Sequence, residues 1–198
     1  NWLNEMVAKT IESNAYILSD TKNKTAKKPS LKNLTILTSG LSGSDLSKAK
    51  QSAKKGFAIG EGVNSAKHLG DMPANHCTPR IIEKKVKAMK KDFPKLKIKS
   101  YNENDLAKMK MGSFLSVGRG SDEPSRMMVI EYKGGSPSEK PIALVGKGIT
   151  FDTGGVSLKP PQAMDEMKWD MCGAASVFGV MSTLARLNAK VNVVGVMA

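Results

Sequence analysis

The chain has 198 residues, of which 40% are hydrophobic and 25% are charged, and this ordinary globular composition excludes disordered and coiled-coil proteins. Its length corresponds to one domain or slightly more. No apolar run approaches the roughly 18–20 residues of a membrane span, and the N-terminal residues lack the features of a signal peptide. The two cysteines, Cys77 and Cys172, fit neither a disulfide framework nor a metal-binding pair. We therefore expect a soluble cytoplasmic protein with free thiols and no membrane association.

The net charge of +13 is concentrated in the first half of the chain. Residues 1–100 carry 20 lysines and arginines against 8 acidic residues, whereas residues 101–198 carry 11 against 10. A basic surface can bind nucleic acid, but few aromatic side chains that could stack on bases lie among these lysines. We favour a solvated lysine-rich face, and a nucleic-acid partner stays open as the alternative. The lysines cluster at 22–32, 48–55 and 84–99.

Helices and two short strands are predicted for the first part of the chain. Apolar residues at near-helical spacing predict a helix over residues 2–11. Apolar and β-branched runs at 16–18 and 34–38 predict strands, separated by the exposed lysine-rich loop 21–30. A long helix is predicted over residues 44–66, capped by its first serine, although glycines weaken its middle.

The remainder alternates helices with strands. Thr78 followed by Pro79 is a typical helix start, because threonine caps the first turn and proline is favoured at the first helical position. The strand 142–145 is apolar throughout, which predicts a central place in a mainly parallel sheet. The other elements predicted from periodicity are a strand over 96–101, a helix over 103–111, a strand over 127–132, a buried helix over 173–187 and a buried strand over 191–198.

Strands that alternate with helices in this way predict an α/β protein with a mixed, mainly parallel sheet flanked by helices. The chain starts directly in a helix without an initial methionine, and its last residues have the composition of a buried strand. We therefore expect it to be an internal piece of a longer protein.

A glycine-rich segment, VGKGITFDTGGVSLKP at 145–160, follows the apolar strand at the place where open α/β sheets bind ligands. A phosphate-binding loop is excluded, because Lys147 is followed by Gly148 and the Walker pattern is not met. Asp152 and Asp170 together have the chemistry to bind a divalent cation through oxygen atoms. A turn-forming Asp152 and a helix-capping Asp170 explain the same spacing, so both interpretations stay open on spacing alone.

This glycine-rich segment, together with MDEMKWDMCGAA at 164–175, resembles the metal-binding segment of the leucyl (cytosol) aminopeptidases, a family of two-metal exopeptidases. The resemblance is close over 142–198, and NSAKHLGDMPANHCTP at 64–79 is similar to the start of the family's catalytic domain. Thr153 and Cys172 stand where the family more usually has serine and glycine, and neither is a charged position.

The resemblance also implies a domain organisation. Residues 1–40 correspond to the end of a smaller N-terminal α/β domain, and residues 41–71 to a linking helix. Residues 72–198 correspond to the first half of the metallopeptidase catalytic domain.

The same resemblance implies a role for each residue of the site. Lys147, Asp152 and Asp170 correspond to metal ligands, with Asp152 bridging two divalent ions, Mn²⁺ or Zn²⁺. Lys159 corresponds to the catalytic lysine that stabilises the oxyanion formed when water attacks the peptide carbonyl. Met167 corresponds to a residue of the substrate-binding pocket, where an unbranched thioether suits leucine-like side chains. The implied reaction is two-metal hydrolysis that releases N-terminal residues from peptide substrates.

The family's remaining carboxylate ligands lie in a second motif of the type NTDAEGR, together with the arginine that holds a bicarbonate acting as general base. No such motif occurs in these 198 residues. The resemblance therefore implies that this chain alone is inactive and that the full protein is a cytoplasmic homohexamer.

Two other classes of function stay open. Some relatives in this family also act as DNA-binding regulatory proteins, and a salt-dependent affinity for duplex DNA would identify that function here. The other class is a catalytically inactive scaffold, against which the intact charged residues of the motif argue. The two histidines, His68 and His76, lie outside the motif, so we expect them to make structural hydrogen bonds.

Overall fold

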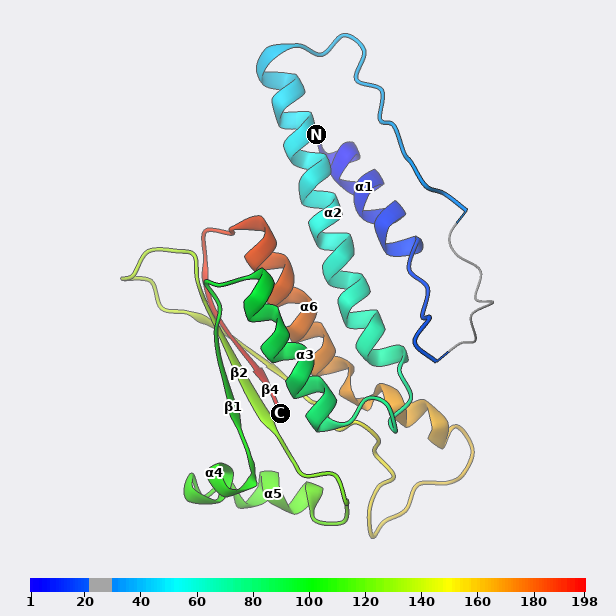
Figure 1. Ribbon diagram of the computed structural model, residues 1–198, viewed down its shortest axis with the longest axis vertical. Coiled ribbons are helices and arrows are strands. Elements are labelled where there is room, and N and C mark those ends of the chain that lie inside the picture. The colour runs from blue at the N-terminus through cyan, green and yellow to red at the C-terminus, as the bar shows by residue number, and fades with distance from the viewer. Residues whose placement is uncertain (22–29) are drawn as a thin grey trace.

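The computed structural model describes residues 1–21 and 30–198, so the predicted loop 21–30 lies almost entirely outside the described residues. No helix in these two ranges combines the length and the apolar composition that a membrane span requires. In chain order the elements are α1 (Trp2–Asn14), α2 (Gly43–Asp71), α3 (Pro79–Asp92), β1 (Lys97–Tyr101), α4 (Glu103–Lys108), α5 (Gly112–Gly118), β2 (Met127–Lys133), β3 (Ile142–Gly146), the 3₁₀ helix η1 (Met164–Met171), α6 (Cys172–Leu187) and β4 (Asn192–Met197) (Figure 1).

Four strands form one sheet in the order β1-β2-β4-β3. The pairs β1–β2 and β2–β4 are antiparallel, and β3–β4 is parallel. The predicted α/β fold with a mixed sheet flanked by helices is therefore confirmed. The mainly parallel pairing predicted for this sheet is wrong for the described strands, because only β3 and β4 pair in parallel, and strand direction depends on the chain connections.

The central position predicted for β3 in the sheet is wrong among the four described strands. β3 lies at the edge of the sheet, and its Val145 side chain is 72% exposed. Apolar composition shows that a strand is suited to burial, whereas its place in the sheet depends on the chain connections. Here the crossover through α6 inserts β4 between β2 and β3.

Helices α3 and α6 cover one face of the sheet (Figure 1). The buried residues of β2, Met128, Ile130 and Tyr132, alternate with less buried neighbours and belong to the same core as both helices. On β4, a Cβ added to Gly195 would lie 2.7 Å from Val177 of α6. The apolar helix α6 is therefore packed directly on the sheet, as its sequence predicts.

Helix α2 packs beside α6, on the side of α6 that faces away from the sheet, and α1 packs against the opposite side of α2 (Figure 1). Gly62 of α2 faces Gly179 of α6, and a Cβ on Gly62 would lie 2.8 Å from the Gly179 carbonyl oxygen. Gly56 permits the same approach by α1, because a Cβ there would overlap the Glu5 carbonyl group. The glycines that lower the helix propensity of α2 are thus the points where its neighbours touch it.

Three further predictions about element boundaries are corrected by the structure. Residues 16–18 and 34–38 are not strands, because isolated β-branched runs form strands only when a neighbouring strand pairs with them. The long helix begins at Gly43, with Ser42 as its N-cap residue, and extends to Asp71. The helix predicted over 103–111 ends at Lys108, and α5 and η1 were not predicted.

The start of α3 agrees with its prediction. Thr78 is the N-cap residue, and its hydroxyl accepts a hydrogen bond from the Ile81 N–H at 3.4 Å. The division into residues 1–40, 41–71 and 72–198 stays a prediction.

Candidate active site

The candidate site lies where β3 ends and where η1 leads into α6. Gly173 permits this close approach, because a Cβ there would lie 2.9 Å from the backbone nitrogen of Lys147. The Ala174 N–H donates to the Lys147 carbonyl at 2.8 Å, and the Ala198 N–H donates to the Gly146 carbonyl at 3.0 Å. These two bonds fix the backbone at the start of the glycine-rich loop.

The structure brings all five predicted site residues together. Lys147 Nζ lies 2.6 Å from Asp170 Oδ2 and 3.5 Å from Asp152 Oδ2. Lys159 Nζ lies 3.3 Å from the same Asp152 oxygen and 3.0 Å from Met167 Sδ. The side chains therefore form one cluster of two carboxylates, two ammonium groups and a thioether, and their catalytic roles stay predictions.

The turn after Asp152 explains how this carboxylate comes to face the lysines. The Gly154 N–H donates to Asp152 Oδ1 at 2.9 Å, and the Lys159 N–H donates to the Thr153 carbonyl at 2.9 Å. Gly154 and Gly155 have φ angles of 89° and 67°, which favour glycine over any L-residue. Oδ1 thus forms the turn, which confirms the turn-forming interpretation, while Oδ2 faces Lys147 and Lys159; the role of Asp152 as a metal ligand stays a prediction.

The helix-capping alternative for Asp170 is wrong. Helix α6 begins at Cys172, and its N-cap residue, Met171, makes no side-chain capping bond. Asp170 lies in η1, and its Oδ2 is buried; within the described residues only the ion pair with Lys147 serves this oxygen. A buried carboxylate oxygen with a single lysine partner is a suitable cation ligand.

Hydrogen bonds at the cluster shift the pKa values of Asp152 and Lys147. The hydrogen bond from the Gly154 N–H, supported by Asp170 and Lys159, lowers the pKa of Asp152 to about 2. The hydrogen bond with Asp170 raises the pKa of Lys147 above its usual value. The two ammonium groups therefore supply the positive charge that these carboxylates require.

These residues fit part of a divalent-metal centre. Asp152 and Asp170 are hard oxygen donors, and Lys147 becomes a nitrogen donor once its amine has lost the proton. Across residues 1–21 and 30–198, no group of three His, Cys, Asp or Glu side chains is placed to hold a metal ion. The cluster can thus supply three ligands, and a complete coordination shell needs further donors.

The histidines and cysteines are not part of the cluster of charged residues. Both cysteines are free, as predicted, and burial raises the pKa of Cys77 to about 11. His68 contacts Lys85 and Asp20, whereas His76 is exposed. The predicted structural hydrogen bonding is confirmed for His68.

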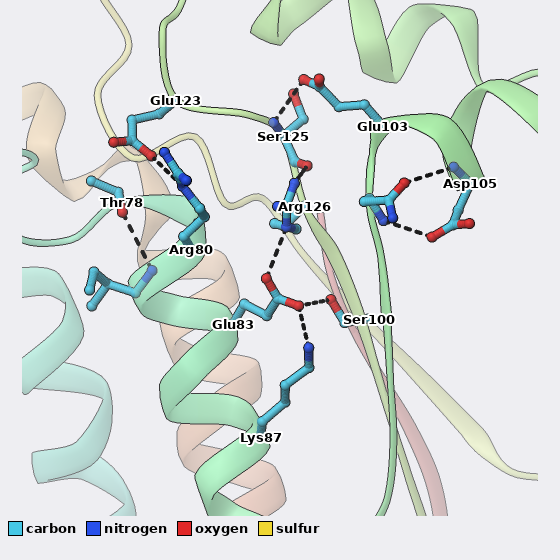
Figure 2. Close-up of polar contacts among 12 residues, drawn as sticks. Thr78, Arg80, Glu83, Lys87, Ser100, Glu103, Asp105, Glu123, Ser125 and Arg126 are labelled. Carbon is cyan, nitrogen blue, oxygen red and sulfur yellow. Dashed lines mark hydrogen bonds and ion pairs between the residues drawn. The ribbon is translucent and has the colours of Figure 1, made fainter.

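A cavity of about 490 Å³ adjoins Lys147. It was not predicted from the sequence. Arg126 in its wall donates from Nε to Glu83 Oε2 at 2.9 Å, as Figure 2 shows. Glu83 also accepts hydrogen bonds from Ser100 at 2.6 Å and from Lys87. This network joins α3, β1 and the start of β2. Local sequence patterns could not predict it, because Ser100 and Arg126 lie 17 and 43 positions from Glu83 in the chain.

An α/β fold that gathers carboxylates and lysines at the end of a strand is typical of a metal-dependent enzyme. The profile of the cytosol aminopeptidase family, catalytic domain, matches residues 64–198. The chain belongs to the cytosol aminopeptidase family, and the resemblance found in the glycine-rich segment is confirmed.

Two relatives and one solved structure illustrate the similarity. The chain is 43% identical over 193 residues to a probable cytosol aminopeptidase of Pseudomonas fluorescens, which covers 98% of this chain and 38% of the relative. It is 44% identical over 197 residues to a probable cytosol aminopeptidase of Alkalilimnicola ehrlichii. That alignment covers 98% of this chain and 39% of the relative. The bottromycin maturation enzyme BotP in complex with Mn is 28% identical, with a TM-score of 0.79 over 98% of this chain and 38% of that chain. The chain thus spans less than half the length of the curated relatives it matches.

Proposed function

We propose that the full-length protein is a metal-dependent aminopeptidase that releases N-terminal residues from peptides. The observation that carries this proposal is the meeting of Lys147, Asp152, Lys159 and Asp170 at the end of β3, with ion-pair distances of 2.6–3.5 Å. Membership of the cytosol aminopeptidase family supports the hydrolysis of peptides. Because these 198 residues span 38% of the Pseudomonas fluorescens relative, the proposal concerns the full-length protein, and we expect the chain alone to be inactive.

Lys147, Asp152 and Asp170 would hold two divalent ions, Mn²⁺ or Zn²⁺, with Asp152 shared between them. When bound, such ions polarise the peptide carbonyl and lower the pKa of the attacking water. The protein's part is to present Asp152 Oδ2 and the buried Asp170 Oδ2 close to Lys147 Nζ, at 3.5 and 2.6 Å. The Mn named with BotP supports manganese as one candidate.

Lys159 stabilises negative charge on the substrate in this proposal. Its ammonium is held 3.3 Å from Asp152 and 3.0 Å from Met167 Sδ, and 34% of its side chain is exposed. The side chain is therefore partly accessible to a carbonyl oxygen that arrives at the site, where an ammonium group would stabilise the developing negative charge. Met167 borders the space for the first side chain of the substrate, and its flexible thioether suits leucine-like residues. A bicarbonate bound by residues outside this chain would supply the general base.

The assembly and the location of the protein follow from the same proposal. We place it in the cytoplasm as a homohexamer without a membrane partner. The names of the curated relatives, which are cytosol aminopeptidases, support the location.

The substitution Lys159→Ala in the full-length protein tests the role of this lysine. Loss of one oxyanion donor typically lowers kcat by about 10²–10³, and bound metal should be unchanged because the ammonium is not a ligand. Lys147→Ala should instead lose metal together with activity. The measurements are steady-state kinetics on leucyl anilide and metal content on the same samples.

Lys140→Ala is the matched control, because Lys140 is an exposed lysine outside the cluster. Its kcat and metal content should equal those of the unaltered protein. A near-normal kcat for Lys159→Ala, or parallel loss of metal and activity, would show that this role is wrongly assigned.

A further inference from the structure

His68 is a point of contact between three parts of the chain, away from the candidate active site. It lies near the C-terminal end of α2, and its Nε2 is 3.0 Å from Lys85 Nζ of α3. The same nitrogen is 3.2 Å from Asp20 Oδ2 in the segment 15–21, which follows α1. Figure 1 shows this segment running beside the end of α2, opposite the body of the sheet.

One ring nitrogen cannot serve both neighbours in the same protonation state. When Nε2 is unprotonated, its lone pair accepts a hydrogen bond from the Lys85 ammonium, and the Asp20 carboxylate has no proton to bind there. When Nε2 carries a proton and the ring is positive, it donates to Asp20 and is repelled by Lys85. In the neutral ring the proton can also lie on Nε2 and be donated to Asp20, so it is protonation of both ring nitrogens that removes the Lys85-bound arrangement and leaves Asp20 as the partner.

We propose that His68 is a proton-operated latch, which in its neutral form accepts from Lys85 of α3 and in its protonated form holds Asp20 and the segment 15–21. This inference is independent of the proposed aminopeptidase activity. It concerns how firmly the segment between α1 and α2 is attached to the rest of the protein.

The surrounding charges determine which form is present at neutral pH. Burial, followed by the Lys85 ammonium, lowers the pKa of His68 below its usual value, whereas Asp20 and Asp71 oppose this change. Asp92 of α3 and Arg186 of α6 line the same groove of about 410 Å³. The lowered pKa favours the neutral ring, in which Nε2 can accept from Lys85, and acid shifts the population toward the Asp20-bound form.

Other contacts attach the end of α1 and Tyr16 to α2. Lys67 Nζ donates to the Ser13 carbonyl at 2.6 Å and lies 5.7 Å from the centre of the Tyr16 ring. Asn64 Nδ2 donates to the Glu12 carbonyl at 2.9 Å. These contacts hold the start of the segment near α2 without involving His68, so His68 adds a pH-dependent attachment to an existing one.

The first experiment measures the titration midpoint of His68 in the full-length protein. Exchange of the imidazole C2 proton for deuterium, followed by mass spectrometry across pH, reports this midpoint for each histidine peptide. We expect Asp20→Asn to lower the midpoint of His68 and Lys85→Met to raise it, each by about half a pH unit or more. The exposed His76 is the internal control and should keep its midpoint in both variants.

The second experiment measures backbone amide exchange in the segment 15–21, corrected for the intrinsic effect of pH. Exchange should slow at least about twofold when the pH falls below the midpoint of His68, because the new bond to Asp20 opposes local opening. The substitutions His68→Gln and Asp20→Asn should both remove this response. Shifts of the His68 midpoint in the same direction in both variants, or an unchanged response in His68→Gln, would overturn the latch.

Discussion

Asp152 performs two tasks with two oxygen atoms. Oδ1 accepts the Gly154 N–H and thereby closes the turn that brings Lys159 back to the cluster, while Oδ2 faces both lysines. A substitution can therefore remove the negative charge of Asp152 and keep the shape of its side chain. An amide at this position retains an oxygen acceptor for the turn but removes the negative charge.

If Asp152 is the shared ligand of the proposed two-metal centre, Asp152→Asn in the full-length protein should lose at least one metal equivalent, because a neutral amide would replace a charged ligand. Asp170→Asn should weaken one ion more than the other. Metal content by mass spectrometry, together with calorimetric titration with Mn²⁺ or Zn²⁺, measures both effects. Asp165→Asn changes an exposed carboxylate of η1 and is the control. Unchanged stoichiometry in Asp152→Asn would contradict the ligand assignment.

Among the secondary-structure elements, α2 depends most on close helix packing. Gly56 and Gly60 face α1 and Gly62 faces α6, at separations that leave no space for a side chain. The tightest contact to α6 involves Gly62, whose added Cβ would overlap the Thr183 hydroxyl and lie 2.8 Å from a backbone oxygen. The threonine can rotate, but the backbone oxygen cannot move without shifting α6.

Gly62→Ala should therefore destabilise the protein by about 1–3 kcal/mol, although alanine has the higher helix propensity. The thermal midpoint and the urea midpoint of the full-length protein measure the change. Gly112→Ala is the matched control, because a Cβ at Gly112 of α5 meets no atom within 4 Å. If both alanine variants were equally stable, the close approach of α2 and α6 would be in doubt.

For the molecule as a whole, Glu83 connects elements that are distant in sequence. Burial alone would raise the pKa of Glu83, but hydrogen bonds from Lys87, Ser100 and Arg126 outweigh it and lower the pKa to about 2 (Figure 2). The ionised carboxylate thus holds α3 against β1 and the start of β2. A folded-state pKa below the model-compound value of 4.5 means that this stabilisation is complete above about pH 4.5.

The contribution of Glu83 should be lost as the pH falls from about 4.5 to 2, since the carboxylate then takes up a proton only at a cost to the folded state. The full effect is at most about 3 kcal/mol, at 1.36 kcal/mol per pKa unit. Glu83→Gln should lower stability at pH 7 and flatten the acid limb of the stability curve. Urea unfolding at a series of pH values compares the two proteins, and identical acid limbs would contradict the network.

The uneven charge of the chain bears on the nucleic-acid alternative. Residues 1–100 carry 20 basic against 8 acidic residues, and the lysines of the outer surfaces of α3 and β1 are exposed. A duplex-DNA site that neutralises 6–10 phosphates would lose about 10³–10⁵ in affinity between 50 and 200 mM salt. We expect weak binding without sequence preference at physiological salt. Fluorescence anisotropy with labelled duplexes measures this, and a sequence-specific complex that survives there would favour the DNA-binding alternative.

Much of the candidate site could be predicted because its residues lie in one short stretch of the chain. The glycine-rich loop and η1 bring Lys147, Asp152, Lys159, Met167 and Asp170 together, and the family resemblance identifies each of them. The carboxylate orientations could not be predicted. Whether Asp170 caps α6 or faces Lys147 depends on where η1 ends, and spacing alone leaves both outcomes open.

Local sequence is sufficient for elements whose stabilising contacts are themselves local. The start of α3 at Thr78 and Pro79 and the apolar helix α6 belong to this class, because capping and helical periodicity act within about four residues. Long-range contacts set the remaining features, namely the edge position of β3, the absence of strands at 16–18 and 34–38, and the partners of Glu83 and His68. Strand order and ion pairing depend on which distant segments meet in the folded chain, and no local periodicity encodes that meeting.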